Sequence, residues 1–393
     1  MPNALVALGG SFLAAGLLAR LGRKVGMPTI PFFMAAGIIT GPHTPGLVLI
    51  DNPADLKVFA AVGLIMLLFH LGLEFSLTDL IKGGPRLLGT GGLYILLNVG
   101  GGLALGFTLG WGSREAFVVA GVVGISSSAI VTKLLVELKR LANRETPMIL
   151  GVIVVEDIFL ALYLALLQPI LGQAQGPLEA LVLFGRAFAF LVALFLVARF
   201  GAHWVGRLVS SDDDELLTVL FVGIAILVAG MAEEIGVSDA IGAFMVGLIL
   251  AETRAAPRIE HLVLPLRDAF GAVFFFAFGL TIDPADIMGV VGPVAVAAAL
   301  SLVLNVAAGI FAARIQGFGR PEAANAGLTL LGRGEFSLIL ATLAAAAGLD
   351  ARIGPFVALY VVVLAVASPL LASRSQSLAR LLPSRMLSEH RTS

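Results

Sequence analysis

The chain has 393 residues, of which 59% are apolar and 13% are charged, about half the ~25% charged fraction typical of a soluble protein. This composition argues against a cytosolic enzyme, because a soluble chain of this length needs more polar surface. The 25 basic and 26 acidic residues nearly balance, so the net charge of −1 indicates no nucleic-acid partner. The lack of cysteine excludes disulfides, thiol nucleophiles and cysteine metal sites.

Long apolar segments follow one another along the whole chain. A helix needs roughly 20 apolar residues to cross a bilayer, with ~17 to 25 as the range. The segments predict about thirteen spans, near residues 3–20, 28–43, 56–76, 86–110, 115–137, 147–171, 177–199, 215–235, 238–252, 263–281, 286–314, 322–347 and 354–373. We therefore expect an all-α polytopic membrane protein, with a transmembrane domain over residues 1–373 and a short cytoplasmic tail over 374–393.

Basic residues are distributed unevenly between the loops of the two sides. With thirteen spans, one set of loops and the C-terminal tail hold 19 Lys and Arg residues. The opposite loops hold only Lys57, Arg114 and Arg352. Cytoplasmic loops are enriched in Lys and Arg. The pattern predicts an integral plasma (inner) membrane protein whose N-terminus lies outside and whose C-terminus is cytoplasmic.

Two parts of the chain resemble each other at a spacing of about 207 residues. The motif Phe69–Phe75 matches Phe276–Ile282, and the same offset carries Asn98 onto Asn305. The matching spans are the third and the tenth, so the two copies point in opposite directions across the membrane. This pattern predicts the inverted-topology repeat of secondary transporters. Chance similarity between helices rich in Phe, Gly and Leu is the alternative.

Two spans at corresponding positions of the repeat are interrupted. Gly124 and Ser126–Ser128 fall halfway along the fifth span, near residues 115–137, and Gly332–Glu335 fall within the twelfth, near residues 322–347. Paired breaks are the best sequence indication of a transporter site, because an unwound helix exposes carbonyls and partly charged helix ends. The alternative is that Gly and Ser only allow close packing of helices.

Two adjacent carboxylates, Glu156 and Asp157, lie near the middle of the sixth span. A charge at mid-bilayer costs at least ~2.5 kcal/mol, so such residues are functional candidates. A buried carboxylate can take up either a proton or an alkali cation, which is the minimal chemistry of exchange. The alternative is a buried ion pair that only fixes the orientation of the helix.

Other polar residues of the broken spans are candidates for supporting roles. Hydroxyl oxygens are hard ligands that suit alkali cations. They are supplied by Ser126, Ser127, Ser128 and Thr132. Arg333 and Glu335 either neutralise each other or brace the broken helices, and Lys133 forms a local pair with Glu137 one turn away.

Motifs for other kinds of chemistry are missing from the sequence. It has no P-loop lysine motif and no Gly-rich dinucleotide fingerprint after the last span, and its histidines are scattered. No nucleophile and base stand at a plausible spacing. We therefore expect no cofactor and no enzymatic activity.

The motifs together resemble the monovalent cation:proton antiporter superfamily, specifically its Kef-type branch of potassium/proton and sodium/proton exchangers. They are Gly37–Pro42, Phe69–Glu74, Ser126–Ile130, Glu156–Asp157, Glu233–Gly236, Gly242–Phe244, Phe278–Leu280 and Gly332–Phe336. The resemblance covers residues 1–373. It implies a homodimer in membrane lipid, each protomer having a dimerisation domain and a core that moves like an elevator. It also implies that Asp157 carries the ion and the proton, and that the two broken helices cross beside it.

The sequence departs from this family at two places. Relatives often have Asp, Gln or Asn before the essential Asp, where this chain has Glu156. They commonly carry Lys or Arg in the eleventh span facing the acidic pair, where this chain has Asn305, the repeat counterpart of Asn98. The cytoplasmic nucleotide-binding domain of many relatives is missing, which resembles the arrangement with a separate cytoplasmic regulatory subunit.

The sequence therefore predicts a transporter that exchanges a monovalent cation, potassium rather than sodium, for protons. In this hypothesis Asp157 is the ligand of the monovalent cation, and oxygens of the serines and Thr132 assist. Two other hypotheses remain open. One is a sodium-coupled organic-anion symporter on a similar inverted-repeat fold, and the other is a cation channel or membrane-embedded sensor.

Overall fold

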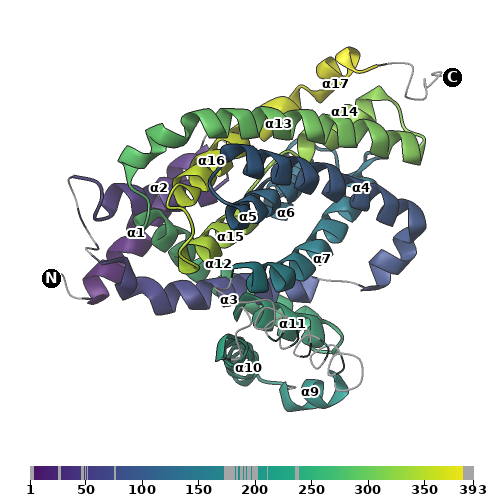
Figure 1. Ribbon diagram of the computed structural model, residues 1–393. Coiled ribbons are helices and arrows are strands. Elements are labelled where there is room, and N and C mark those ends of the chain that lie inside the picture. The colour runs from purple at the N-terminus through teal and green to yellow at the C-terminus, as the bar shows by residue number, and fades with distance from the viewer. Residues whose placement is uncertain are drawn as a thin grey trace. The chain divides into compact units, whose positions relative to one another are not determined.

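The computed structural model describes residues 4–24, 28–45, 52–74, 77–171, 202–209, 211–234 and 239–383, with a few isolated positions between them. Every long element in these ranges is an α-helix (Figure 1). Eight helical stretches of the described chain are long and apolar enough to cross a membrane. The prediction of an all-α polytopic membrane protein is confirmed.

Each expected span other than the seventh corresponds to one helix or to a broken pair of helices. The helices are α1 (Ala4–Lys24), α2 (Ile30–Thr40), α3 (Lys57–Glu74), α4 (Leu77–Leu109), α5 (Ser113–Gly124), α6 (Ser128–Glu137), α7 (Thr146–Leu171), α10 (Asp214–Glu234), α11 (Asp239–Ala251), α12 (Ala256–Leu280), α13 (Pro284–Gln316), α14 (Arg320–Thr329), α15 (Glu335–Ala346) and α16 (Ile353–Ser373). Two short helices, α9 (Ala202–Val209) and α17 (Ser375–Leu378), were not expected. The seventh span, near 177–199, lies outside the described residues apart from isolated positions.

The chain forms two compact units. Unit 1 comprises Met1–Leu17, Phe33–Ser76 and Ala161–Thr281, and unit 2 comprises Leu18–Phe32, Leu77–Leu160 and Ile282–Ser393. Both broken spans and the Glu156–Asp157 pair belong to unit 2. All candidate site residues therefore lie within one compact body.

Within unit 1, glycines let two corresponding pairs of helices approach to backbone contact. Gly37 of α2 lies against the backbone of Phe276 on α12, and Gly72 of α3 lies against the backbone of Phe244 on α11. A Cβ at either glycine would collide with a carbonyl oxygen. The predicted repeat relates α2 to α11 and α3 to α12, so these two contacts are equivalent. The tight packing is what small residues provide between membrane helices.

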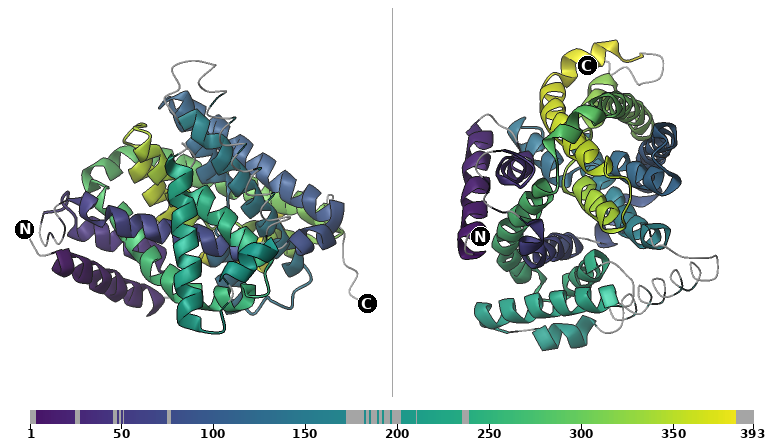
Figure 2. Two further views of the ribbon diagram at one scale, coloured as in Figure 1. Left: turned by 90° about the horizontal axis from the view of Figure 1, so that it is seen from below. Right: turned by 60° about the vertical axis from the view of Figure 1, so that its left-hand side comes forward.

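Within unit 2, the repeat places equivalent residues against each other. Asn98 of α4 and Asn305 of α13, 207 residues apart, share a hydrogen bond of 3.0 Å. α4 packs on α5 and α13 packs on α14, and the blue helices α4 to α6 lie beside the green-to-yellow helices α13 to α16 in both views of Figure 2. The inverted repeat predicted from the sequence is confirmed by this arrangement.

Some helix boundaries differ from those expected. α12 begins at Ala256, seven residues before the expected start, because charged residues end an apolar window without ending a helix. α4 begins at Leu77 and is interrupted at Gly84, whose φ of 65° is left-handed, just before Pro85. The first residues of the expected tail form α17, which packs against α14 of unit 2.

Candidate functional site

The first break lies between α5 and α6. α5 ends at Gly124, and Ile125 and Ser127 have extended backbone conformations before α6 begins at Ser128. The hydroxyl of Ser127 caps α6 by accepting a hydrogen bond of 3.4 Å from the Ile130 amide. The predicted interruption at Gly124 and the three serines is therefore confirmed.

The second break lies between α14 and α15, over residues 330–334. Gly332 and Gly334 lie there in close contact with side chains at the first break. A Cβ on Gly332 would lie 2.8 Å from the Ile130 side chain, and a Cβ on Gly334 would lie 2.5 Å from the Ser127 hydroxyl. Real Cβ atoms essentially never come so close, so a larger residue at either position would force the Ile130 or Ser127 side chain to shift.

The two breaks cross, and direct hydrogen bonds join them. The Ser127 amide donates to the Gly332 carbonyl at 2.9 Å, and the Ser127 hydroxyl donates to Glu335 Oε2 at 2.9 Å. The Ser126 hydroxyl donates to the Leu330 carbonyl at 2.9 Å. Backbone groups that unwinding leaves without helical partners are thus satisfied by the other broken helix.

Arg333 is fully buried at the crossing, with none of its surface exposed. Its Nε and one terminal nitrogen donate to the Val123 carbonyl at 3.0 and 2.7 Å, and its other terminal nitrogen donates to the Leu330 carbonyl at 2.9 Å. Val123 lies in the last turn of α5, where carbonyls carry partial negative charge. The guanidinium therefore joins the end of α5 to the end of α14.

The two adjacent carboxylates have different environments. Glu156 is 1% exposed, its Oε2 accepts from the Ser126 amide at 3.4 Å, and its Oε1 lies 3.2 Å from the Ser126 hydroxyl oxygen. The charge of Arg333 also acts on Glu156. Asp157 is half-buried, and adjacent helix residues point about 100° apart. Glu156 is thus part of the crossing, whereas Asp157 keeps some exposed surface.

Asn305 occupies the position where relatives are expected to have a basic residue. Its amide nitrogen donates to Asn98 Oδ1 at 3.0 Å and to the Ser301 carbonyl at 2.9 Å. Arg333 donates to the same Asn98 oxygen at 3.3 Å. The positive charge nearest to this polar group therefore comes from the second break and not from α13.

The remaining predicted residues lie on α6. Ser128 begins the helix and is half-buried, whereas Thr132 is exposed. Lys133 and Glu137 form an ion pair of 3.6 Å one turn apart. The hydroxyls of Ser126 and Ser127 hydrogen-bond to Glu156 and Glu335.

Tyr94 of α4 belongs to the site but was not predicted. Its side chain is fully buried, and its hydroxyl has no hydrogen-bond partner among the described residues. The charges of Glu156 and Arg333 both act on it. The sequence feature that could have indicated Tyr94 is its position in an otherwise apolar span, one turn before Asn98.

Tyr94→Phe is expected to leave the stability of the protein nearly unchanged. The hydroxyl makes no hydrogen bond to the described residues, so no such bond is lost in the variant. The substitution also removes a buried polar atom whose desolvation costs free energy. The thermal midpoint in detergent should stay within about 2 °C of wild type. A large decrease would mean that the hydroxyl has a partner, such as an ordered water, in the working protein.

Unit 1 holds a separate polar group at the ends of α3 and α12. His70 is buried, and its Nδ1 lies 3.2 Å from a guanidinium nitrogen of Arg267 and 3.7 Å from a carboxylate oxygen of Glu74. Glu260 brings a third potential metal ligand close. The guanidinium beside the ring opposes a cation there, so this group is best explained as a contact between the two helices.

Comparisons with known proteins show the family of the chain. Residues 10–373 match the family model described as sodium/hydrogen exchanger, transmembrane. The K(+)/H(+) antiporter subunit KhtU of Bacillus subtilis is 40% identical over 388 residues, which cover 97% of this chain and 96% of that protein. The putative K(+) efflux antiporter KefB of Alkalimonas amylolytica is 29% identical over 341 residues, which cover 85% of this chain and 51% of that protein.

A solved structure shows the same fold. The structure of the sodium proton antiporter MjNhaP1 from Methanocaldococcus jannaschii at pH 8 matches 96% of this chain and 98% of its own, with a TM-score of 0.72 and 16% sequence identity. At this identity the match concerns the fold alone.

Proposed function

The chain belongs to the sodium/hydrogen exchanger family, in the Kef-type branch of the monovalent cation:proton antiporters, and we propose that it exchanges potassium ions for protons across the membrane. The similarity to a potassium/proton antiporter subunit over nearly the full length of both chains supports potassium over sodium. The crossing of two broken helices beside the adjacent carboxylates Glu156 and Asp157 is the observation that carries the proposal.

Asp157 is the proposed carrier of the cation and the proton. A carrier must be reached by ions, and Asp157 is half-buried whereas Glu156 is almost fully buried. The amide and hydroxyl of Ser126 also contact the Glu156 carboxylate. Binding of a cation to Glu156 would therefore disturb the crossing. Glu156 and Arg333 are therefore assigned to support the site.

The exchange follows from competition at one carboxylate. Ionised Asp157 attracts a cytoplasmic cation, and protonated Asp157 does not, so the two substrates bind alternately. The hydroxyl oxygens of Ser126, Ser127, Ser128 and Thr132 are the proposed assisting ligands. Of these four side chains, only that of Thr132 is exposed.

We also propose how the protein is arranged in the cell. The distribution of basic residues supports an inner-membrane protein with its N-terminus outside and its C-terminus cytoplasmic. Unit 2, which contains the whole site, is the proposed elevator core, and unit 1 is the proposed dimerisation domain of a homodimer. The Bacillus relative is named an antiporter subunit, and a separate cytoplasmic regulatory subunit is proposed as a partner of this chain as well.

Proton flux in proteoliposomes tests the function. With a pH gradient imposed and a fluorescent dye inside, potassium or rubidium added outside should move protons, sodium should move fewer, and the large organic cation N-methylglucamine should move none. The measurement should be repeated at several pH values.

Each alternative function has its own signature in the same vesicles. Large potassium currents without proton movement would instead establish a channel. Sodium uptake that requires an organic anion would establish a symporter. Either result would overturn the proposed exchange.

A further inference from the structure

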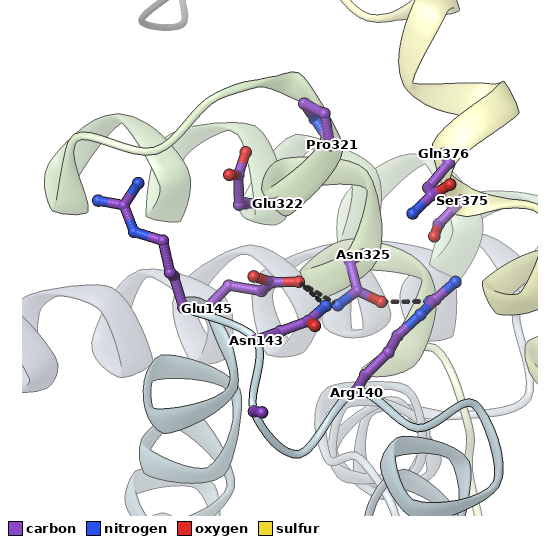
Figure 3. Close-up of a pocket in the computed structure, with 10 residues that line it drawn as sticks. Arg140, Asn143, Glu145, Pro321, Glu322, Asn325, Ser375 and Gln376 are labelled. Atoms are coloured by element: carbon purple, nitrogen blue, oxygen red, sulfur yellow. Dashed lines mark hydrogen bonds between the residues drawn. The ribbon is translucent and has the colours of Figure 1, made fainter. Parts of the chain in front are cut away.

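Unit 2 contains a polar cavity of about 340 Å³ that is separate from the crossing. Such a volume is at the lower end of the range of small-molecule sites. Three segments form it, namely the turn between α6 and α7, the start of α14, and α17 (Figure 3). Under the proposed orientation the cavity opens on the cytoplasmic side.

Buried polar side chains build the floor of this cavity. Asn325 and Glu145 are 3% and 4% exposed, and the Asn325 amide donates to Glu145 Oε1 at 2.5 Å. Arg140 donates to Asn325 Oδ1 at 2.5 Å and to the Ala372 carbonyl at 2.9 Å, and Figure 3 shows Arg140 and Asn325 pointing toward each other. The floor is thus held in place by hydrogen bonds between segments far apart in the sequence.

One donor in the wall of the cavity has no partner. Ser375 is 1% exposed, and its hydroxyl makes no hydrogen bond within the described part of the chain. A buried hydroxyl without a partner costs free energy, and such groups in native proteins usually meet a water or a ligand. Ser375 lines the cavity, so a bound molecule there would satisfy it.

Hydrogen-bond donors that suit an anion line the cavity. Arg140 and Arg144 both line the cavity. Burial lowers the pKa of Arg140, and the charge of the nearby Glu145 opposes this shift. The two lining carboxylates are already engaged, because Glu145 accepts from two amides and Glu322 accepts from the Gly319 amide at 3.1 Å.

We propose that this cavity binds a small phosphate-bearing anion. Guanidinium groups match phosphate oxygens in geometry and charge. A phosphate offers three acceptor oxygens, enough for an arginine of the turn after α6 and the Ser375 hydroxyl of α17, which come from different segments. The site is independent of Asp157, although it touches α14 and the residues that follow α6, the two half-helices whose other ends form the crossing.

Cysteine labelling tests the proposal directly, because the chain contains no cysteine of its own. In a Gln376→Cys variant, maleimide labels one residue in the cavity wall. Saturating inorganic phosphate or glycerol 3-phosphate is expected to slow labelling by about fivefold or more compared with chloride at equal ionic strength. A Ser377→Cys variant, exposed on the same short helix but outside the cavity, should label at the same rate in all solutions.

A second substitution in the Gln376→Cys variant distinguishes phosphate binding in the cavity from a general effect of positive charge on labelling. Arg144→Gln should raise the phosphate concentration that gives half-maximal protection by about tenfold, a loss in the range measured for hydrogen bonds to charged groups. Arg380→Gln, an exposed arginine outside the cavity, should leave that concentration unchanged. Ser375→Ala should raise it severalfold without loss of folding, because this hydroxyl makes no bond to the described residues.

Two sources could supply the phosphate, and the labelling distinguishes them. Protection in vesicles of phosphatidylglycerol but not of phosphatidylcholine, without added phosphate, would identify a lipid headgroup as the ligand. Protection only by soluble phosphate esters would identify a cytoplasmic solute. Equal labelling of Gln376→Cys in phosphate and chloride, in both kinds of vesicle, would overturn the proposal. None of these readouts depends on ion exchange, so a failure here is distinguishable from a failure of the transport hypothesis.

Discussion

Asp157→Asn is expected to abolish cation/proton exchange while leaving the protein folded. Asparagine has nearly the same shape as aspartate, but it neither titrates nor carries a charge, so a cation and a proton no longer compete for it. Proton flux driven by potassium in proteoliposomes should fall to the level of empty vesicles, a decrease of about 100-fold or more if a charge at membrane depth is essential. The thermal midpoint in detergent should stay close to wild type.

Glu156→Gln is the matched control, since it neutralises the neighbouring carboxylate. Two different oxygens of Glu156 contact Ser126, one at its amide and one at its hydroxyl. The glutamine oxygen can accept from the amide while the glutamine NH2 group donates to the hydroxyl oxygen, so the crossing keeps its contacts. Exchange should therefore continue at a reduced rate. Normal exchange in Asp157→Asn together with complete loss in Glu156→Gln would reverse the roles assigned to the two carboxylates.

Arg333→Ala is expected to destabilise unit 2 strongly. The substitution removes the donors to the Val123 and Leu330 carbonyls and leaves both acceptors buried near the unwound segments. It also removes the positive charge that acts on Glu156. Breaking a buried charged contact on one side costs about 3–5 kcal/mol of unfolding free energy. Heating in detergent, followed by size-exclusion chromatography, should show a much lower midpoint of aggregation.

Arg333→Lys separates the charge from the hydrogen-bond geometry. Lysine keeps the positive charge but not the planar fork that reaches two carbonyls at once. Its midpoint should fall between those of wild type and Arg333→Ala. If Arg333→Ala melts like wild type, the crossing does not depend on the guanidinium.

The helices and their breaks could be predicted from the sequence because both depend on local chemistry. Long apolar runs specify spans, and the glycines and serines at Gly124–Ser128 and Gly332–Gly334 cannot continue a helix as readily as their neighbours. The inverted repeat was also visible, because the Asn98 and Asn305 positions kept the same residue at the same offset.

The contacts of the site could not be predicted in the same way. The main acceptors of Arg333 are backbone carbonyls, which every residue carries, so no side chain in the sequence indicates them. The pairing of Ser126 with Glu156 depends on how α7 rotates against the first break. The docking of α17 on α14 was also hidden, since a short polar segment after the last span is usually solvated.

The crossing has a consequence for the balance between the two end states of a transport cycle. In a transporter made of two identical inverted halves, symmetry would exchange the inward-open and outward-open forms and make them equal in energy. At this crossing the halves differ. Ser127 corresponds to Glu335 at an offset of 208 residues, and the same offset places Ile125 opposite Arg333. Within the two breaks the charged side chains, Arg333 and Glu335, come from the second half, whereas the first half contributes Glu156 from α7. Because the charges of the two halves are not equivalent, symmetry does not require the two forms to be equal in energy.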